Sequence, residues 1–67
     1  MEQKERLEAF ERMMADVTRQ HAQTAEKMQA LKAQGRERSA TYRQLMGEKL
    51  QLARILGMYR LYGLTDE

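Results

Sequence analysis

Residues 7–31 read LEAFERMMADVTRQHAQTAEKMQAL, and their pattern determines the fold. Mostly apolar side chains recur along this stretch at alternating spacings of three and four residues, which place them on one face of an α-helix. Such a pattern, sustained over four heptads, is typical of the seam of a coiled coil. The remaining positions are rich in Glu, Lys, Arg, Gln and Ala, which favour helix formation. The seam residues are Leu7, Phe10, Met14, Val17, His21, Thr24, Met28 and Leu31.

A short polar connection separates this helix from a second one. Gly35 is expected to adopt the left-handed backbone conformation that ends many helices. Ser39 is a preferred N-cap residue and is expected to begin the second helix. Thr41 is a competing N-cap, because Gln44 three residues later completes a capping box.

The sequence therefore predicts two helices, at about residues 3–33 and 39–62. Gly63 followed by the apolar Leu64 indicates a Schellman motif at the end of the second helix. A link this short makes consecutive helices antiparallel neighbours. We expect residues 1–67 to form a single all-α domain, an antiparallel helical hairpin.

The composition excludes several classes of protein. The chain has 67 residues, of which 33% are charged and 42% hydrophobic, and it contains no cysteine. Its longest uncharged stretch is six residues, whereas a membrane-spanning helix needs roughly 20 apolar ones. The charged residues Glu2, Lys4 and Arg6 do not fit a signal peptide. Because there is no cysteine for disulfides, we expect a cytoplasmic protein that does not bind membranes.

The second helix carries more apolar surface than one neighbouring helix can cover. Its expected inner face runs from Tyr42 to Tyr59, and further apolar side chains lie on both sides of that face. A lone hairpin would then leave Ile55, Tyr59 and Tyr62 exposed to water. The expected inner face comprises Tyr42, Leu45, Met46, Lys49, Leu52, Ala53, Leu56 and Tyr59, with Met58, Leu50 and Leu61 outside it.

We therefore expect a homodimer. A chain shorter than ~70–80 residues rarely gains more than ~3–5 kcal/mol of stability from its own core. Two hairpins related by two-fold symmetry would bury the additional apolar surface in a four-helix bundle, with their relative direction left open. The residues expected at the interfaces of this bundle are Leu7, Phe10, Met14, Val17, Leu45, Leu52, Ile55, Leu56, Tyr59 and Tyr62.

Two glycines lie inside the second helix. Gly47 and Gly57 each cost the helix ~1 kcal/mol relative to alanine, so a compensating role is expected. Ala53 and Gly57 are four residues apart and would let a neighbouring helix approach closely. The alternative is a second helix that is frayed or kinked around Gly57.

Three polar side chains are expected in the middle of the seam. Antiparallel pairing about the turn places Thr24 opposite Lys49 and His21 opposite Leu52. We interpret His21, Thr24 and Lys49 as a polar layer that fixes the register of the helices. The alternatives are simple solvation, with Lys49 extended outward, and a pH-sensitive or ligand-binding site.

The sequence does not indicate an enzyme, and no metal or cofactor is expected. It has one histidine, no cysteine and no Glu-x-x-His pair for a metal site in a helical bundle. Glu5, Glu8 and Glu11 recur at helical spacing, which is typical of a solvated helix face. Catalysis therefore has no candidate residues.

The turn between the helices is a candidate anion-binding or partner-binding site. Cations near the start of the second helix oppose its dipole, so they need another explanation. Together with the free N–H groups of the first turn, guanidinium groups would attract a phosphate or a carboxylate. The competing interpretation is an ordinary solvated turn. The candidate residues are Lys32, Arg36, Arg38, Ser39 and Arg43.

Tyrosine and methionine near the C-terminal end of the second helix indicate an interaction surface. Tyr is rigid and Met adaptable, and both residue types are common at protein interfaces. We expect a small non-enzymatic module that binds itself and a protein partner through such surfaces. The cluster comprises Ile55, Met58, Tyr59, Leu61, Tyr62 and Leu64.

In its length and in its expected assembly, the chain resembles the Rop family of RNA-binding hairpins. This resemblance implies an alternative function, the binding of paired RNA loops by a regulator that uses a basic surface. Here Arg12, Arg19 and Lys27 alternate with Asp16 and Glu26, so no functional residue of the family is carried over. An RNA contact of this chain would instead use the basic turn and its surroundings, with Lys27, Arg36, Arg38 and Arg43.

Overall fold

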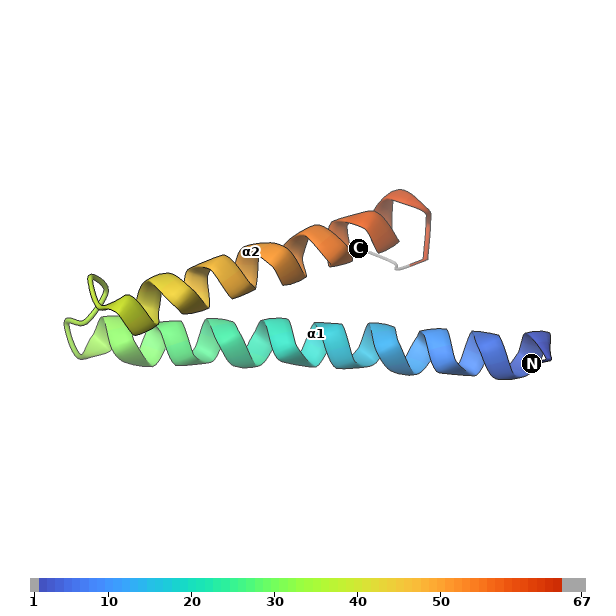
Figure 1. The fold of residues 1–67 in the computed structure, drawn as a ribbon, viewed down its shortest axis with the longest axis horizontal. Coiled ribbons are helices and arrows are strands. Elements are labelled where there is room, and N and C mark those ends of the chain that lie inside the picture. Colours follow the sequence, from blue (N-terminus) through green and yellow to red (C-terminus); the bar gives the residue numbers. More distant parts are fainter. Residues whose placement is uncertain (1, 65–67) are drawn as a thin grey trace.

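The computed structural model describes residues 2–64 and shows a helical hairpin (Figure 1). Helix α1 spans Gln3–Ala33 and helix α2 spans Ala40–Leu61. The predicted all-α hairpin is confirmed, and each predicted helix end lies within one residue of the observed one. Within the described range the chain forms no strand.

The end of α1 is a Schellman motif centred on Gly35, which has a φ of +71°. The amide of Gly35 donates to the carbonyl of Lys32 at 2.9 Å, and the amide of Arg36 donates to the carbonyl of Leu31 at 2.8 Å. These bonds satisfy carbonyl groups that the end of an α-helix otherwise leaves unpaired. Helix α1 therefore ends at the place that Gly35 indicates in the sequence.

Ser39 is the N-cap of α2. Its Oγ accepts a hydrogen bond from the amide of Tyr42 at 3.1 Å and donates one to the carbonyl of Arg36 at 2.8 Å. Thr41, the competing N-cap, lies inside the first turn of α2. One serine thus caps the helix and also closes the loop that precedes it.

Helix α2 runs without interruption through Gly57 and ends in a second Schellman motif. Gly63 has a φ of +72°, its amide donates to Arg60, and the amide of Leu64 donates to the carbonyl of Tyr59 at 2.9 Å. The predicted Schellman motif is confirmed. The alternative of a helix frayed around Gly57 is wrong, because α2 continues to Leu61.

The core of the hairpin is a thin seam between the two helices. Five side chains of the described residues are buried, and even these keep 6–8% of their surface exposed. No large side chain in this part of the chain is completely buried. The five are Val17, Thr24 and Met28 from α1, and Leu52 and Tyr59 from α2.

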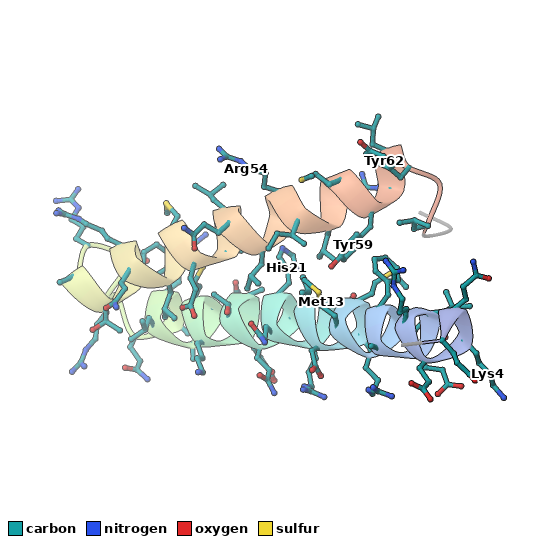
Figure 2. All side chains as sticks on the ribbon, turned by 45° about the vertical axis from the view of Figure 1, so that its right-hand side comes forward. Lys4, Met13, His21, Arg54, Tyr59 and Tyr62 are labelled. Atoms are coloured by element: carbon teal, nitrogen blue, oxygen red, sulfur yellow. The ribbon has the colours of Figure 1, made fainter. Side chains whose placement is uncertain are left out.

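The helix axes diverge from the turn toward the open end, where an aromatic pair bridges them (Figure 1). The rings of Phe10 and Tyr59 have centroids 5.3 Å apart and planes at 74°, an edge-to-face contact. Figure 2 shows Tyr59 directed toward α1. Aromatic rings have the reach to span a wider gap, so Tyr59 is 8% exposed. The prediction that a lone hairpin leaves Tyr59 in water is wrong, and Ile55 is half-buried.

Two further expectations about the seam are wrong. Met46 and Ala53 do not face α1 but are exposed, because they lie about 100–140° around α2 from the buried Leu52 and Tyr59. Leu7 is 57% exposed because α1 is longer than α2 and runs past its end (Figure 1). The N-terminal end of α1 therefore has no neighbouring helix within the hairpin.

The hairpin is long and thin, with extents of 49 × 21 × 16 Å. Its accessible surface is 5797 Å². A compact monomer of 7.9 kDa would expose about 4,400 Å², so this chain exposes roughly 1,400 Å² more. The hairpin thus hides much less of its surface than a protein of this size usually does.

Candidate functional site

The outer side of α2 carries a continuous apolar stripe. Its members follow one another at spacings of four, three, four and four residues, which keeps them on one side of the helix. Leu50 is 65% exposed, Leu61 81% and Met46 43%. We call this surface the α2 stripe; it comprises Met46, Leu50, Ala53, Gly57 and Leu61.

Gly57 is part of the α2 stripe, and the hairpin itself does not require a glycine there. A Cβ added at Gly57 would meet nothing within 4 Å, and its backbone is helical. Gly47 is in the same situation, but it lies on the polar side of α2 beside Arg43, Gln44 and Glu48. The contacts within the hairpin therefore explain neither glycine.

A second exposed apolar surface lies on the opposite edge of α2. Met58 is 56% exposed and Tyr62 is 73% exposed, one helical turn apart. At 100° per residue they lie about 100–140° around the helix from Gly57. Figure 2 shows Tyr62 pointing away from α1. The structure thus divides the predicted C-terminal cluster. Tyr59 is buried, Ile55 is half-buried, and the other members are exposed: Leu61 in the α2 stripe, Met58 and Tyr62 on this edge, and Leu64 beyond the end of the helix.

The predicted interface residues divide into exposed side chains and side chains covered within the hairpin. Leu7 and Tyr62 are exposed, and the remaining members are buried or half-buried between α1 and α2. Contacts within one hairpin therefore use most of this set. The members that are at least partly covered are Phe10, Met14, Val17, Leu45, Leu52, Ile55, Leu56 and Tyr59.

The basic turn displays its cations to solvent. Lys32, Arg36, Arg38 and Arg43 are all exposed. Ser39 is half-buried, and its hydroxyl proton is used by the carbonyl of Arg36. Among the residues that the structure describes, the single ion pair joins Arg19 to Asp16 on α1 at 2.6 Å. The turn therefore presents unpaired positive charge but no enclosed anion site.

The predicted polar layer lies in the seam. Thr24 is 6% exposed, and His21 and Lys49 are half-buried. Figure 2 shows His21 directed into the space between the helices. The seam is therefore less apolar at mid-length than at its aromatic end.

One polar atom in the seam is buried without a partner. The hydroxyl of Tyr59 is inaccessible to solvent and makes no hydrogen bond. An unpaired buried hydroxyl lowers the free energy of unfolding, so it slightly destabilises the open end of the hairpin. Nothing in the sequence signals it, because the reach of a tyrosine depends on how far the helices diverge.

The described residues show open surface hollows and no metal-binding cluster. Two open hollows are present, and each is lined by side chains of one helix. Between residues 2 and 64, no three His, Cys, Asp or Glu side chains group in a way that would hold a metal ion. Neither α1 nor α2 combines the length and apolarity that crossing a membrane requires.

In comparisons with known proteins, no protein-family model matches the chain, and no curated protein or solved structure matches it. The resemblance to the Rop family therefore stays one of length and expected assembly. The candidate surfaces of this chain are the α2 stripe, the edge formed by Met58 and Tyr62, and the basic turn.

Proposed function

We propose that the protein is a small non-enzymatic interaction module that forms a homodimeric four-helix bundle and binds a protein partner. One observation carries the proposal: the hairpin exposes 5797 Å², roughly 1,400 Å² more than a compact protein of its mass. Stable interfaces cover about 800 Å² on each partner, so the excess is large enough for a dimer. The composition also favours a cytoplasmic location.

The nature of the exposed side chains supports this proposal. The excess surface includes large apolar groups such as Leu50, Leu61 and Tyr62, each more than 60% exposed. Groups of this kind are rarely clustered on the surface of a monomer, and they are common where two proteins meet. Packing a second hairpin against the first would bury such groups in a bundle core.

Sedimentation equilibrium over a range of protein concentrations tests the self-association. We expect a species of twice the 7.9 kDa chain mass that dissociates on dilution. Circular dichroism over the same concentration range measures how much helix a single hairpin retains after the dimer dissociates. A helical monomer that persists at every concentration would contradict the proposal.

The edge formed by Met58 and Tyr62 is the proposed surface for the protein partner. It lies away from the α2 stripe, so it stays available if the stripe is covered by a second copy. Nitration of tyrosines in the dimer, mapped by mass spectrometry, tests this availability. Tyr62 should react readily, whereas the buried Tyr59 should not. Protection of Tyr62 in the dimer would place it in the self-interface instead.

A second candidate function is RNA binding through the basic turn. The observation that favours it is the exposure of Lys32, Arg36, Arg38 and Arg43 without an ion-pair partner among the described residues. Binding to a paired RNA loop would weaken steeply as salt rises, because phosphate contacts release counterions. A salt titration with a labelled RNA hairpin separates this function from docking through Met58 and Tyr62, which is insensitive to salt.

A further inference from the structure

We infer that the second copy packs on the α2 stripe, with the two hairpins antiparallel and their turns at opposite ends of the bundle. This inference rests on the proposed homodimer and adds the surface and the direction. The two α2 helices would cross near Ala53 and Gly57. The acidic end of each α1 would lie beside the basic turn of the other copy.

The choice of surface follows from the apolar side chains that the hairpin leaves uncovered. The α2 stripe combines three large exposed side chains with a helix-interior glycine at which an added Cβ would meet nothing within 4 Å. A glycine in a helix costs stability, and one that lies among exposed apolar side chains favours close approach by a backbone outside the hairpin. Ala53 precedes it by one turn and is also small and exposed.

The position of Ala53 along the hairpin agrees with a two-fold axis close to it. Phe10 contacts Tyr59, so Ala53 lies beside the middle of α1 and Gly57 lies one helical turn nearer the open end. Antiparallel hairpins that overlap fully have their two-fold axis at mid-length. The small residues therefore lie where two α2 helices would approach most closely.

Leu7 and Met14 extend the same surface onto α1. Both helices are right-handed and run antiparallel, so the edge of α1 that carries these residues is on the same side of the hairpin as the α2 stripe. Leu7 is 57% exposed at the end of α1 that α2 does not reach. In an antiparallel pair, the turn end of the second copy would cover it.

Charge favours the antiparallel direction. Residues 2–11 hold four carboxylates and two cations, and residues 32–43 hold four cations and one carboxylate. These segments occupy opposite ends of the hairpin (Figure 1). Antiparallel packing brings each acidic end to a basic turn, whereas packing with the turns together would bring like charges close. It also explains the arginines at the start of α2, which the helix dipole disfavours.

Paired glycine substitutions test the surface. Gly57→Leu and Gly47→Leu both replace a helix-interior glycine with open space around it, so both should raise the helix propensity of α2 equally. Gly57→Leu should weaken the dimer roughly tenfold or more in sedimentation equilibrium, because the helices can no longer approach closely. Gly47→Leu should leave the dissociation constant unchanged. Equal effects of the two changes would overturn the assignment of the surface.

A distance measurement tests the direction. The chain has no cysteine, so Gln34→Cys gives one exposed spin-label site beside the turn. Pulsed electron paramagnetic resonance on the labelled dimer should give a distance close to the 49 Å length of the hairpin. A distance shorter than half that length would show the turns together and overturn the antiparallel direction.

The proposed function and this inference fail in different ways. A wild-type protein that sediments as a monomer would overturn the homodimer itself. A wild-type dimer that tolerates Gly57→Leu, or that has its turns together, would leave the homodimer standing and overturn only the packing described here.

Discussion

The two apolar faces of α2 differ in what covers them. The inner face, with Leu52 and Tyr59, packs on α1, and both residues are 8% exposed. The outer face, the α2 stripe, is as apolar, but Leu50 and Leu61 are 65% and 81% exposed. One helix thus carries two packing surfaces and the hairpin uses one of them. Stability of the fold and self-association can therefore be altered separately.

The largest effect is expected from alanine at the centre of each face. Leu52→Ala should cost the hairpin about 2–4 kcal/mol, because it removes a buried side chain from a thin seam. Leu50→Ala removes the same atoms from an exposed position, so it should weaken the dimer without unfolding the chain. Urea denaturation and sedimentation equilibrium measure the two effects. Equal losses of stability at low protein concentration would contradict the separation of the faces.

Tyr59→Phe examines the one unpaired hydroxyl on the inner face. Removing a buried hydroxyl that makes no hydrogen bond should leave stability unchanged or raise it by about 1–2 kcal/mol. The edge-to-face contact with Phe10 would be kept. Thermal denaturation by circular dichroism measures the change. A clear loss of stability would mean that the hydroxyl finds a partner, and a second copy of the chain would then be the first candidate.

Ser39→Ala tests whether the turn acts on the hairpin alone. The change removes the N-cap bond to the amide of Tyr42 and the bond to Arg36, and should cost about 1 kcal/mol. Because neither bond involves the outer face, the dimer dissociation constant, corrected for the population of folded chain, should stay the same. Thr41→Ala is the control, since Thr41 makes no capping bond and should have a smaller effect.

The residues that begin and end the helices were the most predictable part of the fold. Gly35, Ser39 and Gly63 act through hydrogen bonds to residues within five positions along the chain, so local sequence is enough to place them. The hairpin followed from the short link between the helices.

The packing was less predictable because it depends on the angle between the helices. Spacing at 100° per residue predicts which side of α2 faces α1, but it does not predict how far the axes diverge. Divergence explains why Tyr59 is buried by reaching Phe10. The exposure of Leu7 follows from the unequal lengths of the two predicted helices, a signal that was present in the sequence.

His21→Leu compares the polar layer with the apolar remainder of the inner face. If the layer serves to fix the register, leucine should raise stability by about 1 kcal/mol or less, since the site is half-buried. The melting temperature should then rise by up to roughly 4–8 °C. A fall in melting temperature would show that the histidine makes a contact that the fold needs. Sedimentation of the variant would show whether the register of the bundle is still unique.

The smallest effect is expected from the surface ion pair. Asp16→Asn breaks the ion pair with Arg19. Because the side chains of Asp16 and Arg19 are 53% and 63% exposed, the free energy of unfolding should fall by no more than about 0.5 kcal/mol. Added salt should reduce even this difference. A larger loss, measured in the same denaturation assay, would indicate that Asp16 contacts a second copy of the chain.

The divergence of the helices has a geometric consequence for any assembly of this protein. Each hairpin is a wedge, narrow at Gly35 and broad where Phe10 meets Tyr59. If the narrow end of one hairpin packs beside the broad end of the other, the pair has an even thickness. If the two narrow ends pack together, the pair is itself wedge-shaped and its broad end is poorly packed. The taper of a single chain thus favours a head-to-tail pair by shape, independently of any charge.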